Sequence, residues 1–193
     1  MDSLCYTCLD TIRKRISLKV LPGYVFQKSL KEVHFSNLYF LFLYDELYDF
    51  IRLYKFENRI DLINHIVMLI MDVVGDDILR DIDIITFVPN HNKLNNFLIT
   101  LFLANQFNIV FKEVVSINPK NLVLQHLIKD KKSRIENAKN KFVLKNGINL
   151  ANVKKVVVFD DICTTGSSLN EVCRMIRTLN KNILINCMVL AKA

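Results

Sequence analysis

The chain has no tryptophan, only four glycines and three prolines, and no long uninterrupted apolar run. The shortage of glycine and proline excludes collagen-like and low-complexity chains and leaves no candidate linker. No stretch reaches the roughly 18 apolar residues of a membrane-spanning helix, and the first residues lack the apolar core of a signal peptide. With 193 residues, 51% of them hydrophobic, we expect a globular, cytoplasmic protein without a membrane span.

Cysteine is present, but it does not predict disulfides, because five is an odd number and no export signal accompanies it. We expect reduced thiols, with Cys163 filling space against a sheet rather than acting as a nucleophile. Cys5 and Cys8 form a CxxC pair, which supplies only two of the four ligands of a structural zinc site. Nothing from residue 9 to residue 162 is a cysteine, so we do not expect zinc to bind there.

The net charge of +7 is concentrated in one segment. Residues 119–145 contain eight basic and two acidic side chains, a surplus of six. Charge alone favours a solvated, lysine-rich surface, and the alternative is a basic flap over an anionic ligand.

Apolar periodicity predicts alternating helices and strands from residue 58 onward. The expected elements are a helix over 58–74 with a stop at Gly75, strands over 82–88, 109–115, 153–159 and 183–190, a helix over 94–107, and a helix after Gly166 capped by Ser167 or Ser168. This order describes an α/β fold with an open parallel sheet, in which ligands bind beyond the carboxyl ends of the strands. Residues 1–57 are less regular, with a strand followed by a helix within 35–54, and we treat them as a small N-terminal region before a domain over 58–193.

The stretch VVVFDDICTTGSSL, residues 156–169, joins the strand at 153–159 to the following helix. The first amides of a helix have no partners within it, and Gly166 lets the backbone approach a ligand closely. Thr164, Thr165, Ser167 and Ser168 add hydroxyl donors, so this loop suits a phosphate monoester.

Asp160 and Asp161 would repel that phosphate, so they should face another part of the ligand. Acidic pairs bind the vicinal hydroxyls of a sugar, directly or through a divalent ion. The sequence therefore predicts a sugar phosphate as the ligand, and the plainer alternative is that these side chains only cap the helix and fill a turn. Neither G-x-G-x-x-G nor G-x-x-x-x-G-K-[ST] is present, which excludes a dinucleotide fingerprint and a P-loop.

These residues resemble the signature of the type I phosphoribosyltransferases, which bind phosphoribosyl pyrophosphate. Other parts of the chain resemble the competence protein F (ComF) family. They are YDELYDFIRLYKFENRIDL at 44–62, the series Gln125, Arg134, Asn137 and Phe142, and the CxxC of Cys5 and Cys8.

The resemblance implies a type I phosphoribosyltransferase fold in which Asp160 and Asp161 are the catalytic residues that hold the ribose, with Mg²⁺ nearby on the pyrophosphate. It implies that residues 119–142 form a mobile flap. The substrate-binding residues it implies, besides this acidic pair, are Thr164, Thr165, Gly166, Ser167, Ser168, Pro89, Asn90, Lys131 and Arg134.

The reaction implied is displacement of pyrophosphate by a nitrogen acceptor of unknown identity. Enzymes that act on 6-oxopurines carry an acid at the position of Thr164, so we do not expect that acceptor. The stretch HNKLNNF at 91–97 keeps one lysine where the family is rich in arginine. The alternative is a non-catalytic protein of DNA uptake that retains the site and binds competence proteins or single-stranded DNA.

Overall fold

The computed structural model describes residues 6–48, 50, 62–90, 94–119 and 141–193. The first half contains α1 (Tyr6–Arg15), β1 (Lys19–Pro22), the 3-10 helix η1 (Gly23–Lys28), β2 (Asn37–Leu43), the 3-10 helix η2 (Tyr44–Leu47), α3 (Leu62–Leu79), β3 (Ile84–Phe87) and α4 (Leu94–Gln106). The second half contains β4 (Val110–Phe111), β5 (Val115–Ile117), β6 (Phe142–Leu144), β7 (Lys155–Cys163), α6 (Ser167–Leu179) and β8 (Leu184–Lys192). Among the described helices, none is long and apolar enough to cross a bilayer.

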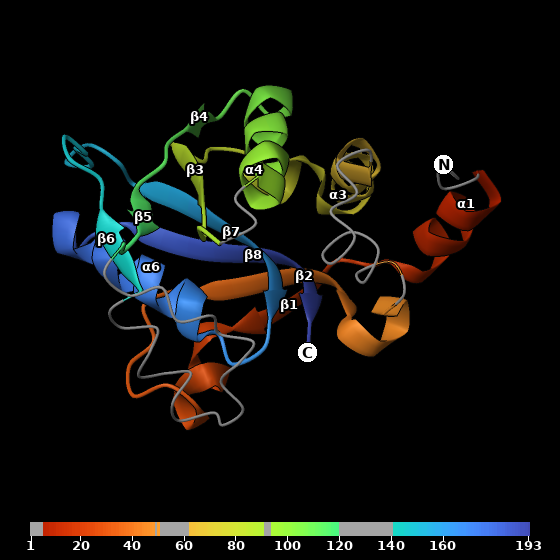
Figure 1. Cartoon of the computed structure of the whole chain (residues 1–193), viewed down its shortest axis with the longest axis horizontal. Coiled ribbons are helices and arrows are strands. Elements are labelled where there is room, and N and C mark those ends of the chain that lie inside the picture. Colours follow the sequence, from red (N-terminus) through yellow and green to blue (C-terminus); the bar gives the residue numbers. More distant parts are fainter. Residues whose placement is uncertain (1–5, 49, 51–61, 91–93, 120–140) are drawn as a thin grey trace.

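The central sheet has six strands in the order β1-β2-β8-β7-β3-β4 (Figure 1). All neighbouring pairs are parallel except β1 with β2. The remaining two described strands, β5 and β6, pair as a separate antiparallel ribbon. The chain is therefore an α/β protein with an open, mostly parallel sheet, which confirms the predicted fold class.

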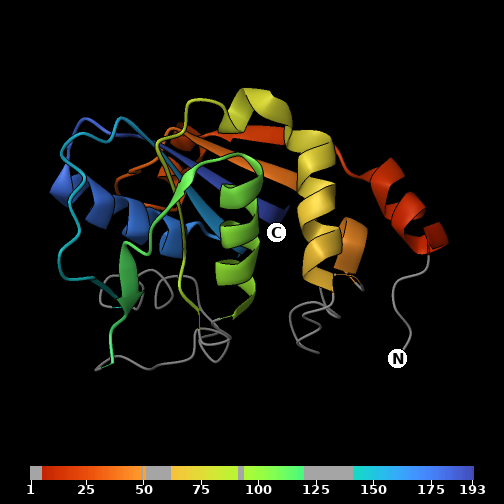
Figure 2. The ribbon, with the colours of Figure 1, turned by 90° about the horizontal axis from the view of Figure 1, so that it is seen from above.

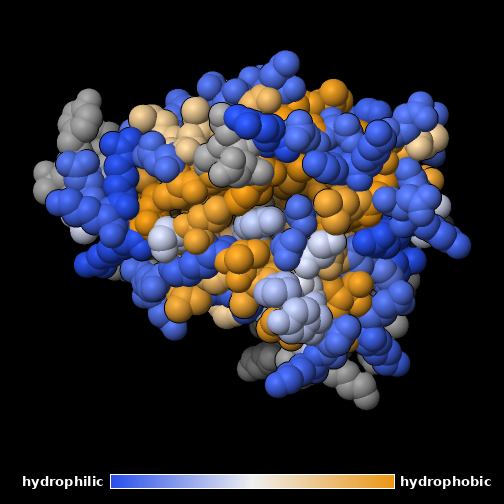
Figure 3. All heavy atoms as spheres, turned by 180° about the vertical axis from the view of Figure 1, so that it is seen from behind, coloured by the Kyte–Doolittle hydropathy of each residue, from blue (hydrophilic) through white to orange (hydrophobic). Residues whose placement is uncertain are grey.

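Both faces of the sheet are covered by an apolar core. Successive side chains of a buried parallel strand point to opposite faces, so one strand contributes to both cores. On β7, Val157 and Phe159 belong to the core under α3 and α4, while Val156 and Val158 belong to the core over α6. Figure 2 shows α3 and α4 side by side on their face of the sheet. With 51% hydrophobic residues, some apolar surface also stays exposed, as the view from behind shows (Figure 3).

The N-terminal region contributes to this sheet. β2 pairs with β8 in parallel, with Leu38 opposite Cys187, and β1 adds an antiparallel edge. The predicted strand and helix within 35–54 correspond to β2 and the short η2, as far as the structure describes them. The predicted boundary between residues 57 and 58 lies outside the described residues, so the division into two domains stays a prediction.

Two element predictions before residue 120 were wrong. Helix α3 does not stop at Gly75 but continues to Leu79. An interior glycine costs a helix about 1 kcal/mol, and Ile78 and Leu79 offset that cost by packing against the core. The single strand predicted over 109–115 is two strands, β4 and β5, in different sheets, because β4 pairs only with Ile84 and Ile85 before the chain leaves the central sheet.

Candidate functional site

The sheet changes direction between β3 and β7, which are neighbours. After β3 the chain passes through α4 to β4 on one side, and after β7 it passes through α6 to β8 on the other. Open α/β sheets bind ligands at such a switch point, beyond the carboxyl ends of the strands. The last register pair of β3 and β7 is Phe87 with Phe159, so residues 88–90 and 160–161 lie together at this edge.

Asp160 and Asp161 lie within β7, not in a loop. The predicted strand end at residue 159 was too early, because β7 stays paired with β8 as far as Cys163, opposite Lys192. Asp160 is 9% exposed and Asp161 is 6% exposed. The amide of Asp161 donates to Asp160 Oδ1 at 2.9 Å, and the amide of Ile162 donates to Asp161 Oδ1 at 2.7 Å. Two adjacent buried carboxylates at a switch point are typical of a functional site, since burial of charge is costly elsewhere.

Asn96 on α4 holds this edge together and was missed by the sequence analysis. Its side-chain Nδ2 donates to the carbonyl oxygen of Val88 at 3.2 Å and to Asp160 Oδ1 at 3.0 Å. It thereby links the ends of β3 and β7 to the first turn of α4. The only sequence signal was a polar residue inside an apolar helical segment.

The loop after β7 turns sharply into α6. Gly166 is the N-cap of this helix, in a left-handed conformation with φ 77°, so the prediction that Ser167 or Ser168 caps it was wrong. Thr165 Oγ1 and Ser167 Oγ lie 2.9 Å apart, and the Ser167 amide donates to Thr165 Oγ1 at 3.3 Å. Within the described part of the chain, the amides of Thr164 and Thr165 donate no hydrogen bond, so they remain available to an anion.

Two buried side chains, those of Phe26 and Cys163, pack against the loop at Gly166. A Cβ added at Gly166 would lie 3.1 Å from the Phe26 ring of η1 and 3.8 Å from Cys163 Sγ. Cys163 is buried, and that burial raises the pKa of its thiol to about 12. A thiol that stays protonated is a poor nucleophile, and the place of Cys163 in the core over α6 agrees with its predicted role as a packing residue.

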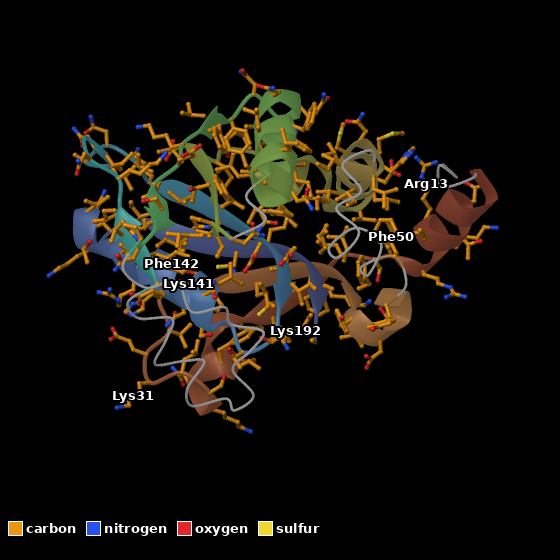
Figure 4. All side chains as sticks on the ribbon, in the orientation of Figure 1. Arg13, Lys31, Phe50, Lys141, Phe142 and Lys192 are labelled. Atoms are coloured by element: carbon orange, nitrogen blue, oxygen red, sulfur yellow. The ribbon has the colours of Figure 1, made fainter. Side chains whose placement is uncertain are left out.

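Lys192 brings a positive charge to the same loop, and the sequence analysis missed it. Its Nζ donates to the carbonyl oxygen of Thr164 at 3.1 Å and also contacts the carbonyl oxygen of Ala193. The residue ends β8, the strand beside β7 (Figure 4). Sequence could not reveal this contact because 28 residues separate Lys192 from Thr164.

A pocket of about 310 Å³ lies on the other side of the β3 end. Its lining residues are Phe87, Pro89, Asn90, Phe97, Glu113, Ser116 and Ile117. Pro89 and Asn90, two of the predicted substrate-binding residues, thus lie near the switch point, and Pro89 has no backbone N–H to donate to a ligand. The Oδ1 atom of Asn90 is buried without a hydrogen-bond partner among the described residues.

Several predicted residues lie outside the description. Lys131 and Arg134 fall within 120–140, and Cys5 falls within 1–5, all beyond the described residues. Cys8 lies on α1, but its side chain is not described. The predicted flap starts and ends at the β5–β6 ribbon, where Ile117 pairs with Phe142. Among the described residues, no group of three or more His, Cys, Asp and Glu side chains is placed to hold a metal ion.

No family model and no curated protein matches this chain. Three solved adenine phosphoribosyltransferases are similar in structure. The first is 16% identical, with a TM-score of 0.45 over 94% of this chain and 89% of that one. An enzyme from Saccharomyces cerevisiae, solved with adenine, is 17% identical, with a TM-score of 0.44 over 96% and 90%. One from Leishmania tarentolae is 12% identical, with a TM-score of 0.43 over 98% and 89%. Likenesses with TM-scores below 0.5 assign neither an activity nor a family to this chain, and the ComF resemblance stays a prediction.

Proposed function

We propose that this chain has a type I phosphoribosyltransferase fold, binds phosphoribosyl pyrophosphate together with Mg²⁺, and transfers the phosphoribosyl group to a nitrogen acceptor. The observation that carries the proposal is one juxtaposition at the switch point. A buried pair of carboxylates and a hydroxyl-rich turn at the start of α6 are separated by only two residues, Ile162 and Cys163. The carboxylates can accept hydrogen bonds from hydroxyl groups, and the turn can donate hydrogen bonds to a phosphate.

The phosphate half would bind at the turn. The amides of Thr164 and Thr165 and the hydroxyls of Thr165 and Ser167 are donors at the N-terminus of α6, where the helix dipole favours an anion. Lys192 adds a positive charge beside Thr164. These features support a dianionic monoester such as the 5-phosphate of a pentose.

The sugar half would bind at Asp160 and Asp161, whose carboxylates accept hydrogen bonds from hydroxyl groups. Two carboxylates without a third acidic, histidine or cysteine ligand nearby in the described residues suit a Mg²⁺ ion that arrives with a diphosphate and keeps its waters. When bound, that ion would neutralise charge on the departing diphosphate.

In the reaction, a nitrogen of the acceptor forms a bond to the anomeric carbon as the carbon–oxygen bond to pyrophosphate breaks. The acceptor loses its proton, and pyrophosphate leaves with the bonding electron pair. Positive charge develops on the sugar in the transition state, and the carboxylates of Asp160 and Asp161 would stabilise it electrostatically. The protein would mainly position the donor and the acceptor and exclude water from them.

The pocket beside Pro89 suits an acceptor better than a diphosphate. Its walls include the rings of Phe87 and Phe97, and its charged lining residue is Glu113, which pairs with Lys145. Apolar and aromatic walls favour an uncharged ring over an anion. This supports placing the acceptor, not the leaving group, on the outer side of β3.

Release of pyrophosphate tests the proposal. Purified protein would be mixed with Mg²⁺, phosphoribosyl pyrophosphate and a panel of bases and amines, with the Asp160→Asn, Asp161→Asn double variant as the control. We expect release by wild type with at least one acceptor and none by the variant. If no acceptor gives release of pyrophosphate although phosphoribosyl pyrophosphate binds, the protein does not catalyse the transfer, and only the binding part of the proposal stands.

The alternative, a non-catalytic role in DNA uptake with competence proteins or single-stranded DNA as partners, depends on the basic segment. Lys129, Lys131 and Lys132 lie outside the described residues, so no structural observation favours this role. It predicts binding of single-stranded DNA that weakens steeply with salt, and the absence of such binding at low salt would exclude direct contact with DNA.

A further inference from the structure

Asn96 is fully buried, and its amide has one chemically acceptable orientation. Both contacts of Nδ2, the Val88 carbonyl oxygen and Asp160 Oδ1, are with acceptors. A flipped amide would place its oxygen against two other oxygens and lose both bonds. The orientation is therefore fixed, and Asn96 Oδ1 has no hydrogen-bond partner among the described residues.

The position of the residue is fixed as well as its orientation. Thr100 Oγ1, one turn later on α4, donates to the Asn96 carbonyl oxygen at 2.6 Å. The end of β3 is held against β7 by a bond from the Val88 amide to the Phe159 carbonyl oxygen at 2.8 Å. Asn96 thus reaches Asp160 from a rigid frame of one helix and two strands.

This contact constrains the Asp160 carboxylate. Oδ1 receives two N–H donors, Asn96 Nδ2 at 3.0 Å and the Asp161 amide at 2.9 Å. Two donors from different directions fix the rotation of the carboxylate and offset the cost of burying its charge. Asn96 Oδ1 has no partner among the described residues, and a buried polar atom without a partner is costly, so this arrangement favours a role beyond a structural link between β3 and α4.

We propose that Asn96 is a positioning residue for the sugar-binding half of the candidate site, and that it acts through Asp160. This inference rests on the proposed function, because it assigns to Asp160 a ligand with hydroxyl groups. Within the described part of the chain, the hydrogen bonds of Asn96 go to Val88, Asp160 and Thr100, and none reaches the turn at 164–168. Loss of Asn96 should therefore weaken recognition of the sugar and leave recognition of the phosphate unchanged.

Two probes separate these halves: ribose 5-phosphate, which engages both, and inorganic phosphate, which engages only the turn. Calorimetry would compare wild type with Asn96→Leu, which keeps the branched shape and removes the amide. We expect ribose 5-phosphate to bind about tenfold more weakly, as for a misaligned charge-assisted hydrogen bond, with phosphate binding unchanged. Asn96→Asp, which keeps the side-chain size and replaces the donor by a carboxylate, should give the same pattern if the leucine variant does not fold.

Thr178→Val is the matched control, because it removes the same kind of hydrogen bond within a helix, from Thr178 Oγ1 to the Met175 carbonyl oxygen at 2.6 Å near the end of α6, without touching Asn96 or Asp160. It should leave both affinities unchanged. A cycle with Asp160→Ala tests the route of action, since Asn96→Leu should have no further effect once the carboxylate is absent.

Equal losses for both probes, or a loss that persists in the Asp160→Ala background, would overturn the positioning role and leave the proposed function standing. Failure of wild type to bind ribose 5-phosphate would instead overturn the proposed function, and the role of Asn96 with it.

Discussion

Gly166 is the position in the turn at which adding a side chain should have the largest effect. It adopts φ 77°, which costs a residue with a Cβ about 1–2 kcal/mol, and its Cα faces the Phe26 ring. Gly147 has nearly the same conformation, φ 76°, but nothing lies within 4 Å of its added Cβ. Comparing the two glycines therefore separates the effect of the left-handed backbone, which both share, from the effect of close packing, which only Gly166 has.

Gly166→Ala should therefore destabilise the protein more than Gly147→Ala does. We expect the difference to be about 1–3 kcal/mol, the cost of overpacking a buried site. Urea unfolding of the two variants beside wild type measures it. Equal losses at the two glycines would show that contact with Phe26 does not constrain the turn.

Lys192 is the second residue whose role can be tested singly. Lys192→Met keeps the length of the side chain and removes the charge beside Thr164. We expect about tenfold weaker binding of ribose 5-phosphate, the value of a hydrogen bond to a charged group, with a weaker dependence on salt. Lys155→Met, at the opposite end of the sheet on β7, is the matched control. An equal effect at Lys155 would show that Lys192 acts only through the net charge of the protein.

At the scale of the elements, Asp83 joins the start of β3 to the start of β7. Its Oδ2 accepts the amides of Lys154 at 2.7 Å and Lys155 at 2.9 Å. The amide of Lys155, then that of Lys154, lowers the pKa of this carboxyl. The carboxylate form therefore stabilises the fold above the unfolded pKa of about 3.9, and that contribution disappears as the pH falls through the lower, folded pKa.

Asp83→Asn should be less stable than wild type at neutral pH, because a neutral amide oxygen is a weaker acceptor for the two N–H groups. The difference should shrink as the pH falls below about 4. Urea unfolding of both proteins across this range measures it. A difference that does not change with pH would show that ionisation of Asp83 does not stabilise the β3–β7 pair.

The sequence predicted the elements well where a periodic pattern extends over a whole helix or strand, as in α4, α6 and β8. It failed where the end of an element depends on a distant partner. β7 continues through Asp160 and Asp161 because β8 remains beside it, and β4 ends early because it pairs only with Ile84 and Ile85, although β3 continues to Phe87 beside β7. Asn96 and Lys192 were missed for the same reason, since each contacts its partner across neighbouring elements and neither contact leaves a pattern along the chain.

The whole molecule explains why distant segments meet at one edge. A parallel sheet brings the carboxyl ends of β3, β7 and β8 to the same side, and these ends supply residues 88–90, the acidic pair and Lys192. The helices on either face bring Asn96 and the start of α6 to that edge. Only the DDICTTGSS stretch is local in sequence, which is why the motif was visible and the residues around it were not.

The central claim is that one crevice holds a pentose by its hydroxyl groups at Asp160 and Asp161 and by its phosphate at residues 164–168. Titration calorimetry of wild type with phosphoribosyl pyrophosphate and Mg²⁺, beside the Asp160→Asn, Asp161→Asn variant, tests it most directly. We expect saturable binding by wild type and about a hundredfold weaker binding by the variant, because the loss of each charge-assisted hydrogen bond costs about tenfold in affinity. Equal affinity in the two proteins, or no binding by wild type, would contradict it.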